Sequence, residues 1–257
     1  NESVIKEKSL DGQVLAAYTE GLDSLRGGDV LFAAKKFNEA EILFPQSEWA
    51  PKSALMAAYS YYSQDYLEDA IAELERFLRV YPLSKDRDYA IYLLANAHYE
   101  KIIDETKDLQ SILLAKKNFN IVLKQFPQTE YALDSEFKLD LINDILASKE
   151  MYIGRYYFDQ KKWIPAINRF RTVIDEYDTT IYVEEALHRL VEVHYTIGLN
   201  KEAEKYARVL GYNYKSSKWY EKTYAVFNKD YEKKRIKTEK KKKSFISKAK
   251  SLFALDE

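Results

Sequence analysis

The sequence predicts an all-α protein built as a solenoid of helical hairpins. Its composition favours helices, because 257 residues contain only 7 Gly and 5 Pro while 32% are charged. A second observation is an internal repeat, since one pattern of small, aromatic and hydroxyl residues returns along most of the chain. Together they predict hairpins stacked on one another around a continuous core.

Each copy of the repeat has an aromatic residue eleven positions after an Ala, and a Ser or Thr fourteen positions after it. The Ala allows a second helix to approach closely, the aromatic fills the gap between hairpins, and Pro or a polar residue after it ends the helix. The hydroxyl residue is expected to cap the next helix. The copies are Ala33/Phe44/Pro45/Ser47, Ala70/Tyr81/Pro82/Ser84, Ala115/Phe126/Pro127/Thr129, Ala166/Tyr177/Asp178/Thr180 and Ala203/Tyr214/Lys215/Ser217.

Within these copies the spacing is that of the tetratricopeptide repeat. A small residue stands twelve positions before the Ala in three copies (Gly21, Ala58, Gly154), and a large apolar residue four positions after it in four copies (Phe37, Leu74, Phe119, Phe170). Both positions are expected where two helices touch. The fold class is therefore a right-handed superhelical solenoid of five tetratricopeptide-like helix-turn-helix repeats plus a C-terminal helix.

The elements follow in order from this frame. The third unit has a polar insertion over 102–111, and the segment 130–158 lacks Pro and has apolar residues at four-residue steps, which predicts one long helix. The expected helices cover 13–27, 29–44, 48–63, 66–81, 86–103, 111–126, 130–158, 161–177, 181–197, 199–213 and roughly 217–250.

Two regions are expected: a repeat domain over 1–228, with helix breakers near 45, 82, 127, 178 and 215, and a Lys-rich helical extension over 229–257. The extension holds 11 Lys/Arg against 5 Asp/Glu. It suits an acidic partner, anionic lipid or nucleic acid, or is simply a solvated terminal helix. Nucleic acid is not expected as a partner, because the body is mildly acidic and carries no basic stripe.

No catalytic, cofactor or metal site is predicted. The chain has no Gly-rich phosphate loop, no nucleophile elbow and no Cys, and His188 and His194 are six residues apart, on different sides of a helix. We therefore expect a protein that binds other proteins and not an enzyme.

A peptide groove is predicted on the concave face, which the first helix of each hairpin lines. In the first two repeats this face is apolar and aromatic, with two cations at its edge, and suits a peptide with aromatic side chains and a free carboxylate. The alternative is that Tyr59 and Tyr62 pack against the next hairpin. The predicted groove residues are Tyr18, Leu22, Arg26, Lys52, Leu55, Tyr59 and Tyr62.

Five repeats with lengthened third and fourth units, the segment W-I-P-A-I-N-R over 163–169 and the segment A-L-H-R-L-V-E-V-H-Y over 186–195 resemble the BamD family, the repeat lipoproteins of the bacterial outer-membrane β-barrel assembly machine. The resemblance covers about residues 10–220. It implies a lipid-anchored protein at the periplasmic face of the outer membrane. The anchoring Cys is absent from these residues, so we expect it to precede them, the alternative being a chain without an anchor.

The resemblance also implies partners. They are the periplasmic domains of BamA, the barrel-forming core subunit, accessory lipoproteins such as BamC and BamE, and the C-terminal peptides of unfolded outer-membrane proteins. In the family an Arg of the W-x-x-A-[IV]-x-R segment pairs with an acidic group of BamA, and Arg169 matches it; the alternative is a surface Arg whose stem covers apolar helix. An independent periplasmic scaffold for cell division or envelope export is the competing function, ahead of a cytosolic co-chaperone.

Overall fold

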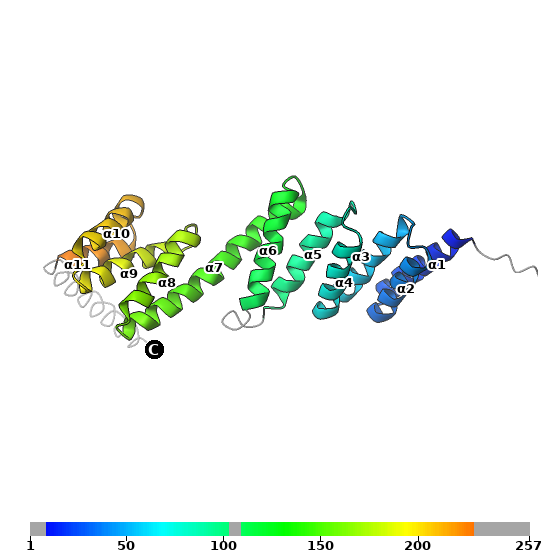
Figure 1. Ribbon diagram of the computed structural model, residues 1–257, viewed down its shortest axis with the longest axis horizontal. Coiled ribbons are helices and arrows are strands. Elements are labelled where there is room, and N and C mark those ends of the chain that lie inside the picture. The colour runs from blue at the N-terminus through cyan, green and yellow to red at the C-terminus, as the bar shows by residue number, and fades with distance from the viewer. Residues whose placement is uncertain (1–8, 103–108, 229–257) are drawn as a thin grey trace, which may run out of the picture. The chain divides into compact units, whose positions relative to one another are not determined.

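The computed structural model describes residues 9–102 and 109–228, and within them every regular element is an α-helix. The predicted extension over 229–257 and most of the predicted insertion lie outside the described residues. None of the described helices is both long and apolar enough to cross a membrane. The helices, labelled in Figure 1, are α1 Leu10–Arg26, α2 Val30–Leu43, α3 Trp49–Tyr62, α4 Leu67–Val80, α5 Arg87–Glu100, α6 Leu109–Gln125, α7 Glu130–Asp159, α8 Trp163–Glu176, α9 Val183–Thr196, α10 Asn200–Asn213 and α11 Lys218–Phe227.

The chain forms two compact units, Asn1–Ile142 and Asn143–Glu257. The first contains the hairpins α1–α2, α3–α4 and α5–α6 and the beginning of α7; the second contains the rest of α7 and α8 to α11. The predicted long helix over 130–158 is confirmed, and the boundary between the units falls inside it. Helix α1 begins at Leu10, three residues before its predicted start, because the Ser9 hydroxyl accepts a hydrogen bond from the Gly12 N–H and caps it.

The core lies where the repeat pattern places it. The apolar residue four positions after each signature Ala is fully buried in four copies, as Phe37, Leu74, Phe119 and Phe170. In the first and fourth copies this ring lies against a glycine of the preceding helix: a Cβ on Gly21 would come 2.9 Å from Phe37 Cε1, and one on Gly154 would come 2.5 Å from Phe170 Cε1. The glycines therefore make room for the rings, as predicted.

The turn inside each hairpin has a left-handed residue that the sequence pattern does not reveal by itself. The residue five positions before the signature Ala has a positive φ in four copies: Gly28 (85°), Asp65 (60°), Lys161 (57°) and Gly198 (82°). In each case the next residue donates its N–H to the carbonyl five positions earlier, for example Leu199 to His194 at 2.8 Å. This is the Schellman ending of a helix, which allows the chain to reverse in a few residues.

The prediction that Ser or Thr caps each following helix is wrong for most copies. Ser217 caps its helix by accepting from the N–H groups of Trp219 and Tyr220, and Ser84 accepts from the N–H of Asp86, the residue before α5. The hydroxyls of Ser47, Thr129 and Thr180 instead donate to the carbonyl of the aromatic residue three positions earlier, at 2.7 to 2.8 Å. The reason is the tight turn at this point, which brings that carbonyl within reach.

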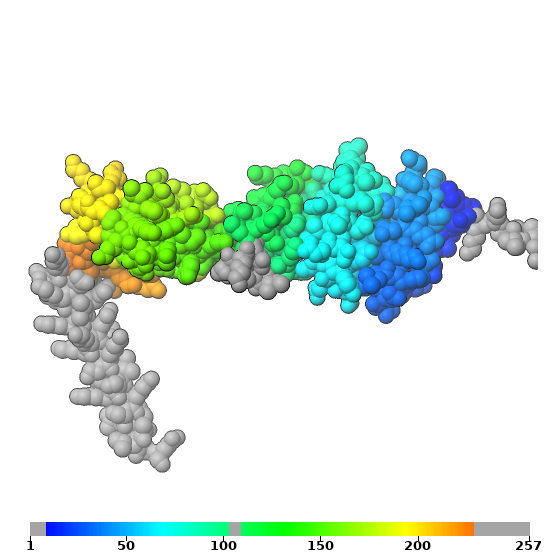
Figure 2. Space-filling view, turned by 60° about the horizontal axis from the view of Figure 1, so that its bottom comes forward, coloured from blue at the N-terminus to red at the C-terminus, as the bar shows by residue number. Residues whose placement is uncertain are grey.

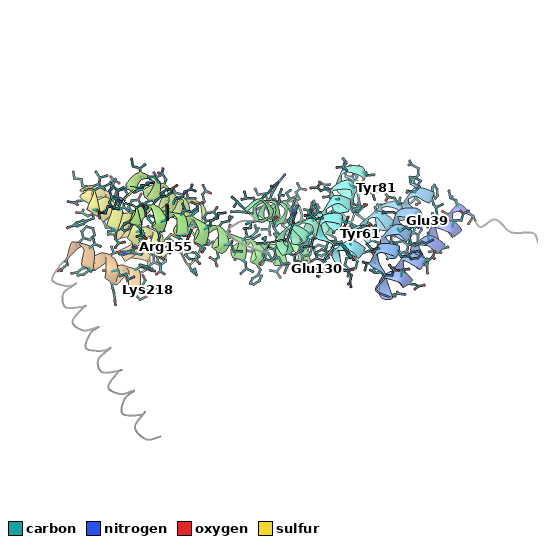
Figure 3. All side chains as sticks on the ribbon, turned by 90° about the horizontal axis from the view of Figure 1, so that it is seen from below. Glu39, Tyr61, Tyr81, Glu130, Arg155 and Lys218 are labelled. Atoms are coloured by element: carbon teal, nitrogen blue, oxygen red, sulfur yellow. The ribbon has the colours of Figure 1, made fainter. Side chains whose placement is uncertain are left out.

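Ion pairs join consecutive hairpins within each unit. In the first unit the Arg76 guanidinium donates to both carboxylate oxygens of Glu41, at 2.8 and 2.7 Å, and the Tyr81 hydroxyl donates to the same carboxylate at 2.7 Å (Tyr81 is labelled in Figure 3). In the second unit Arg155 on α7 pairs with Glu185 on α9 at 3.0 Å. These contacts fix the spacing of neighbouring repeats.

Candidate functional site

The candidate binding site is a groove in the first unit, on the face formed by α1, α3 and α5. It has a volume of about 420 Å³, and it brings together four of the predicted groove residues, Tyr18, Lys52, Leu55 and Tyr59. Tyr18 is held in place edge-on against Phe37 and Trp49, with ring centroids 5.2 and 5.0 Å apart. One wall of the groove is therefore an aromatic ring that packs against two others.

The sequence reasoning missed the third side of this groove, which α5 and the residues just before it provide. Lys85, Asp86 and Tyr89 line it, together with Met56 of α3. A signal for one of them existed: Tyr89 stands seven residues after Pro82, as Lys52 stands seven after Pro45. Applying the repeat frame to the third hairpin as well as the first two finds it.

The charge of the groove favours an anionic ligand. Neither Lys52 nor Lys85 forms an ion pair with any residue that the structure describes, and Asp86 is the one acidic residue in the lining. The Lys52 ammonium lies over the Trp49 ring, 5.1 Å from its centroid. Burial raises the pKa of Tyr89 to about 12, further above physiological pH than the ordinary value of 10, and its hydroxyl is a neutral hydrogen-bond donor. Two lysines beside neutral rings suit a carboxylate attached to apolar side chains.

Three predicted groove residues do not line the groove. Leu22 packs inside the first hairpin against the cluster around Phe37. Arg26 pairs with Asp23 at 3.4 Å on an exposed surface. Tyr62 packs on the core of the second and third hairpins, and its hydroxyl donates to Glu100 at 2.5 Å. The structure therefore shows the alternative for Tyr62, which packs against the next hairpin, whereas Tyr59 faces the groove.

Arg169 lies on α8 in the second unit and has a partner within the chain. Its Nη1 donates to both carboxylate oxygens of Glu150 on α7, at 3.1 and 3.0 Å. The Arg169 side chain is 43% exposed, whereas that of Glu150 is only 17% exposed. The guanidinium is thus held by one carboxylate and still accessible to a second.

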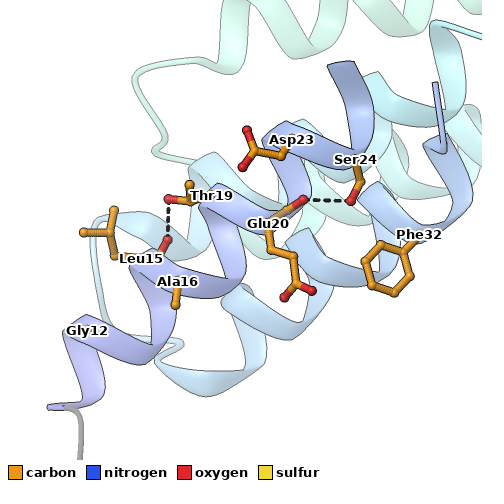
Figure 4. Close-up of a pocket in the computed structure, with 8 residues that line it drawn as sticks. All are labelled: Gly12, Leu15, Ala16, Thr19, Glu20, Asp23, Ser24 and Phe32. Atoms are coloured by element: carbon orange, nitrogen blue, oxygen red, sulfur yellow. Dashed lines mark hydrogen bonds between the residues drawn. The ribbon is translucent and has the colours of Figure 1, made fainter. Parts of the chain in front are cut away.

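The first hairpin has a wider hollow on the outer side of α1, of about 700 Å³ (Figure 4). Its polar groups are already engaged: Thr19 donates to the Leu15 carbonyl and Ser24 to the Glu20 carbonyl. The Glu20 carboxylate pairs with Lys36 at 3.0 Å. This hollow therefore offers no converging polar groups, and it is not a candidate site.

The histidines of the second unit serve packing. His188 shares a 2.8 Å hydrogen bond with the Thr223 hydroxyl, and His194 lies 2.7 Å from the Leu190 carbonyl. In the part of the chain that the structure describes, no group of three or more His, Cys, Asp or Glu residues is arranged to hold a metal ion.

Comparison with known proteins places this repeat frame in a family. The family YfiO, described as "Outer membrane lipoprotein", matches residues 10–210. "Outer membrane protein assembly factor BamD" of Rickettsia prowazekii is 43% identical over 83% of this chain and 85% of that protein. Proteins of the same name from Caulobacter vibrioides and Neisseria meningitidis serogroup A are 40% and 31% identical, over 82% and 80% of this chain and 69% and 81% of theirs. The chain is thus a relative of the assembly factors named BamD, and it belongs to the YfiO family of outer membrane lipoproteins.

Proposed function

We propose that this protein is a non-catalytic scaffold of outer-membrane protein assembly. The relationship to assembly factors named BamD, which extends over four fifths of the chain, is the observation that carries the proposal. The protein acts at the periplasmic face of the outer membrane, attached through an N-terminal lipid, beside BamA and accessory lipoproteins of the same complex. A solenoid suits this role because its long surface offers separate faces to several partners.

The contact with BamA is assigned to the second unit, around Arg169. Its guanidinium has free donors beyond the two that bind Glu150, and a partner carboxylate would complete a charge-assisted pair. Glu150 neutralises part of the Arg169 charge that the partner carboxylate would meet. The assignment is therefore testable from both sides of the ion pair.

The experiment titrates the protein with the periplasmic domains of its cognate BamA. Arg169→Gln should weaken binding by roughly tenfold, because a charge-assisted pair is lost, and Glu150→Gln should strengthen it. Arg171→Gln is the matched control, since Arg171 lies on the same helix, is 56% exposed and pairs with Asp175. Equal weakening by Arg171→Gln would remove the assignment to Arg169. A folded protein that does not bind BamA at all would favour the independent periplasmic scaffold.

The groove of the first unit is assigned to the C-terminal peptides of unfolded outer-membrane proteins. Its rings and Leu55 suit aromatic side chains, and Lys52 and Lys85 suit the terminal carboxylate. A peptide ending in Phe with a free carboxylate should bind, and its amidated form should bind at least several-fold more weakly.

Tyr59→Ala combined with Lys52→Gln should abolish this binding and leave the helical melt unchanged. Tyr66→Ala is the control, because Tyr66 is comparably exposed (43% against 37% for Tyr59) and lies outside the groove. If the amidated peptide binds as tightly as the free acid, the lysines do not recognise a carboxylate and the assignment fails.

A further inference from the structure

Helix α7 presents an apolar surface that no described part of the chain covers. Leu133, Phe137 and Leu141, at four-residue steps, are 74%, 63% and 37% exposed. The opposite side of the same segment is buried: Ala132 packs with Ile91 and Val122 of the third hairpin. We call the three exposed residues the α7 stripe. It belongs to the first unit, near the beginning of α7 that Glu130 marks in Figure 3.

The origin of the stripe is the lengthened fourth repeat. In an ordinary repeat of this chain the first helix is covered by the second helix of its own hairpin, as Gly21 on α1 is covered by Phe37 on α2. In the fourth repeat α8 packs on the later turns of α7, where Phe170 lies against Gly154. The first three turns of α7 have the buried side of a repeat helix and no second helix of their own. In the repeat frame Glu136 and Asp140 stand where α3 has Ala54 and Ala58, which pack with Leu74 of α4, so a second helix would lie beside the stripe.

The charges beside the stripe select the kind of helix that fits there. On one side of it α7 carries Glu136 and Asp140, both exposed, and on the other side Glu130 and Asp134. Lys138, the cation of this segment, pairs with Asp134 at 3.1 Å and lies 5.6 to 5.9 Å from the ring centroids of Tyr92, Tyr99 and Phe119. The carboxylates that it leaves unpaired are those of Glu130, Glu136 and Asp140. An apolar ridge bordered by carboxylates complements an amphipathic helix with Lys or Arg along the borders of its apolar face.

The same charges disfavour other occupants. Anionic lipid and nucleic acid would be repelled by the three unpaired carboxylates, Glu130, Glu136 and Asp140, which lie within three turns. A second copy meeting the stripe with its own stripe would place acidic borders against acidic borders. We propose that the α7 stripe, Leu133, Phe137 and Leu141, is a docking site for a basic amphipathic helix of a partner protein. This interaction is separate from the peptide groove and does not depend on it.

The test uses three synthetic 18-residue peptides and the whole chain. The first peptide has Leu at helical spacing with Lys on both borders, the second has Glu in place of each Lys, and the third is a scrambled form of the first. Fluorescence anisotropy should show binding of the first peptide alone. Leu133→Ser with Phe137→Ser should weaken it by at least about tenfold, because two apolar contacts are lost. Glu136→Lys with Asp140→Lys should transfer the preference to the Glu peptide.

Two controls keep the result specific. Ile42→Ser with Leu83→Ser removes apolar residues of the first unit that are 75% and 97% exposed but lie elsewhere, and it should leave binding unchanged. The groove substitutions Tyr59→Ala and Lys52→Gln should also leave it unchanged. Equal binding of the Lys and Glu peptides, or equal loss in the Ile42 and Leu83 control, would overturn the proposal. So would a dimer of the chain alone that the stripe substitutions dissociate, because the occupant would then be a second copy.

Discussion

The Phe170 ring occupies the space next to Gly154 so closely that a Cβ at residue 154 would lie 2.5 Å from Phe170 Cε1. Phe170 is fully buried, so it has little freedom to move away. The glycine is therefore required by packing, although a glycine inside a helix is itself unfavourable by about 1 kcal/mol relative to Ala.

Gly154→Ala is expected to destabilise the protein by about 1–2 kcal/mol, because overpacking outweighs the gain in helix propensity. Chemical denaturation measures this loss in the free energy of unfolding. In a Phe170→Leu background the same substitution should cost nothing or stabilise, since the ring is gone. Gly27→Ala is the control: its Cβ would meet only carbonyl oxygens at 3.4 Å, so a comparable loss there would show that packing is not the cause.

Lys161→Gly is expected to stabilise the protein by about 1 kcal/mol, because Lys161 has φ 57° and a side chain is unfavourable in this conformation. Gly198→Ala should destabilise by a similar amount, since φ is 82° at the equivalent turn. Thermal unfolding measures the change in stability of both variants. The neighbouring Gln160→Gly, where φ is not positive, should bring a small loss; a gain there would contradict the explanation.

Glu41→Gln is expected to lower the free energy of unfolding by about 2 kcal/mol at pH 7, because Arg76 and Tyr81 lose a buried charged partner. Glu39→Gln, which breaks the exposed pair with Lys36, should cost less than about 0.5 kcal/mol. Burial alone would raise the pKa of Glu41, but hydrogen bonds from Arg76 and Tyr81 lower it below its ordinary 4.5. A lowered folded pKa gives stability that is present above pH 4.5 and lost as the pH falls through the folded value. The cost of Glu41→Gln should therefore shrink in acid, and a cost independent of pH would contradict this.

His98 is expected to make the protein less stable below about pH 6.5. Burial lowers its pKa from the ordinary 6.5; the nearby carboxylates of Glu75 and Glu68 oppose this shift and Lys101 adds to it, and the net direction is downward. Because the folded protein binds the proton less well than the unfolded chain, stability is complete above pH 6.5 and decreases as the pH falls below it. Denaturation between pH 7.5 and 5.5 should show this decrease in the wild type and a flatter profile in His98→Gln. An unchanged slope would exclude His98 as its source.

The helices and their packing could be predicted from the sequence because residues of the same kind recur at each contact position in successive repeats. Phe37, Leu74, Phe119 and Phe170 could be identified as core residues from spacing alone, and all four are fully buried. The left-handed turns escaped notice because Asp65 and Lys161 fill two of the four positions, so no glycine pattern marks them. Capping was mispredicted since a hydroxyl both donates and accepts, and composition does not say which it does.

The groove could be predicted only in part. Tyr18, Lys52, Leu55 and Tyr59 follow from helix periodicity, which gives the direction of a side chain from its own helix. Leu22, Arg26 and Tyr62 do not line it, because packing within the first hairpin, a pair with Asp23 and a bond to Glu100 hold them elsewhere. These are contacts between elements, and periodicity along one helix carries no information about them.

Helix α7 is uninterrupted from Glu130 to Asp159, although the division between the two units falls at Ile142 and Asn143. Domains are usually joined by exposed loops, where proteases cut and where a chain can be shortened without harm. Here the junction has hydrogen-bonded backbone and buried side chains, including Ile142 and Leu146, so it offers neither opportunity. Removing either half would leave a severed helix end on the half that remains, so this junction is not a place at which the two units can be separated without damage to α7.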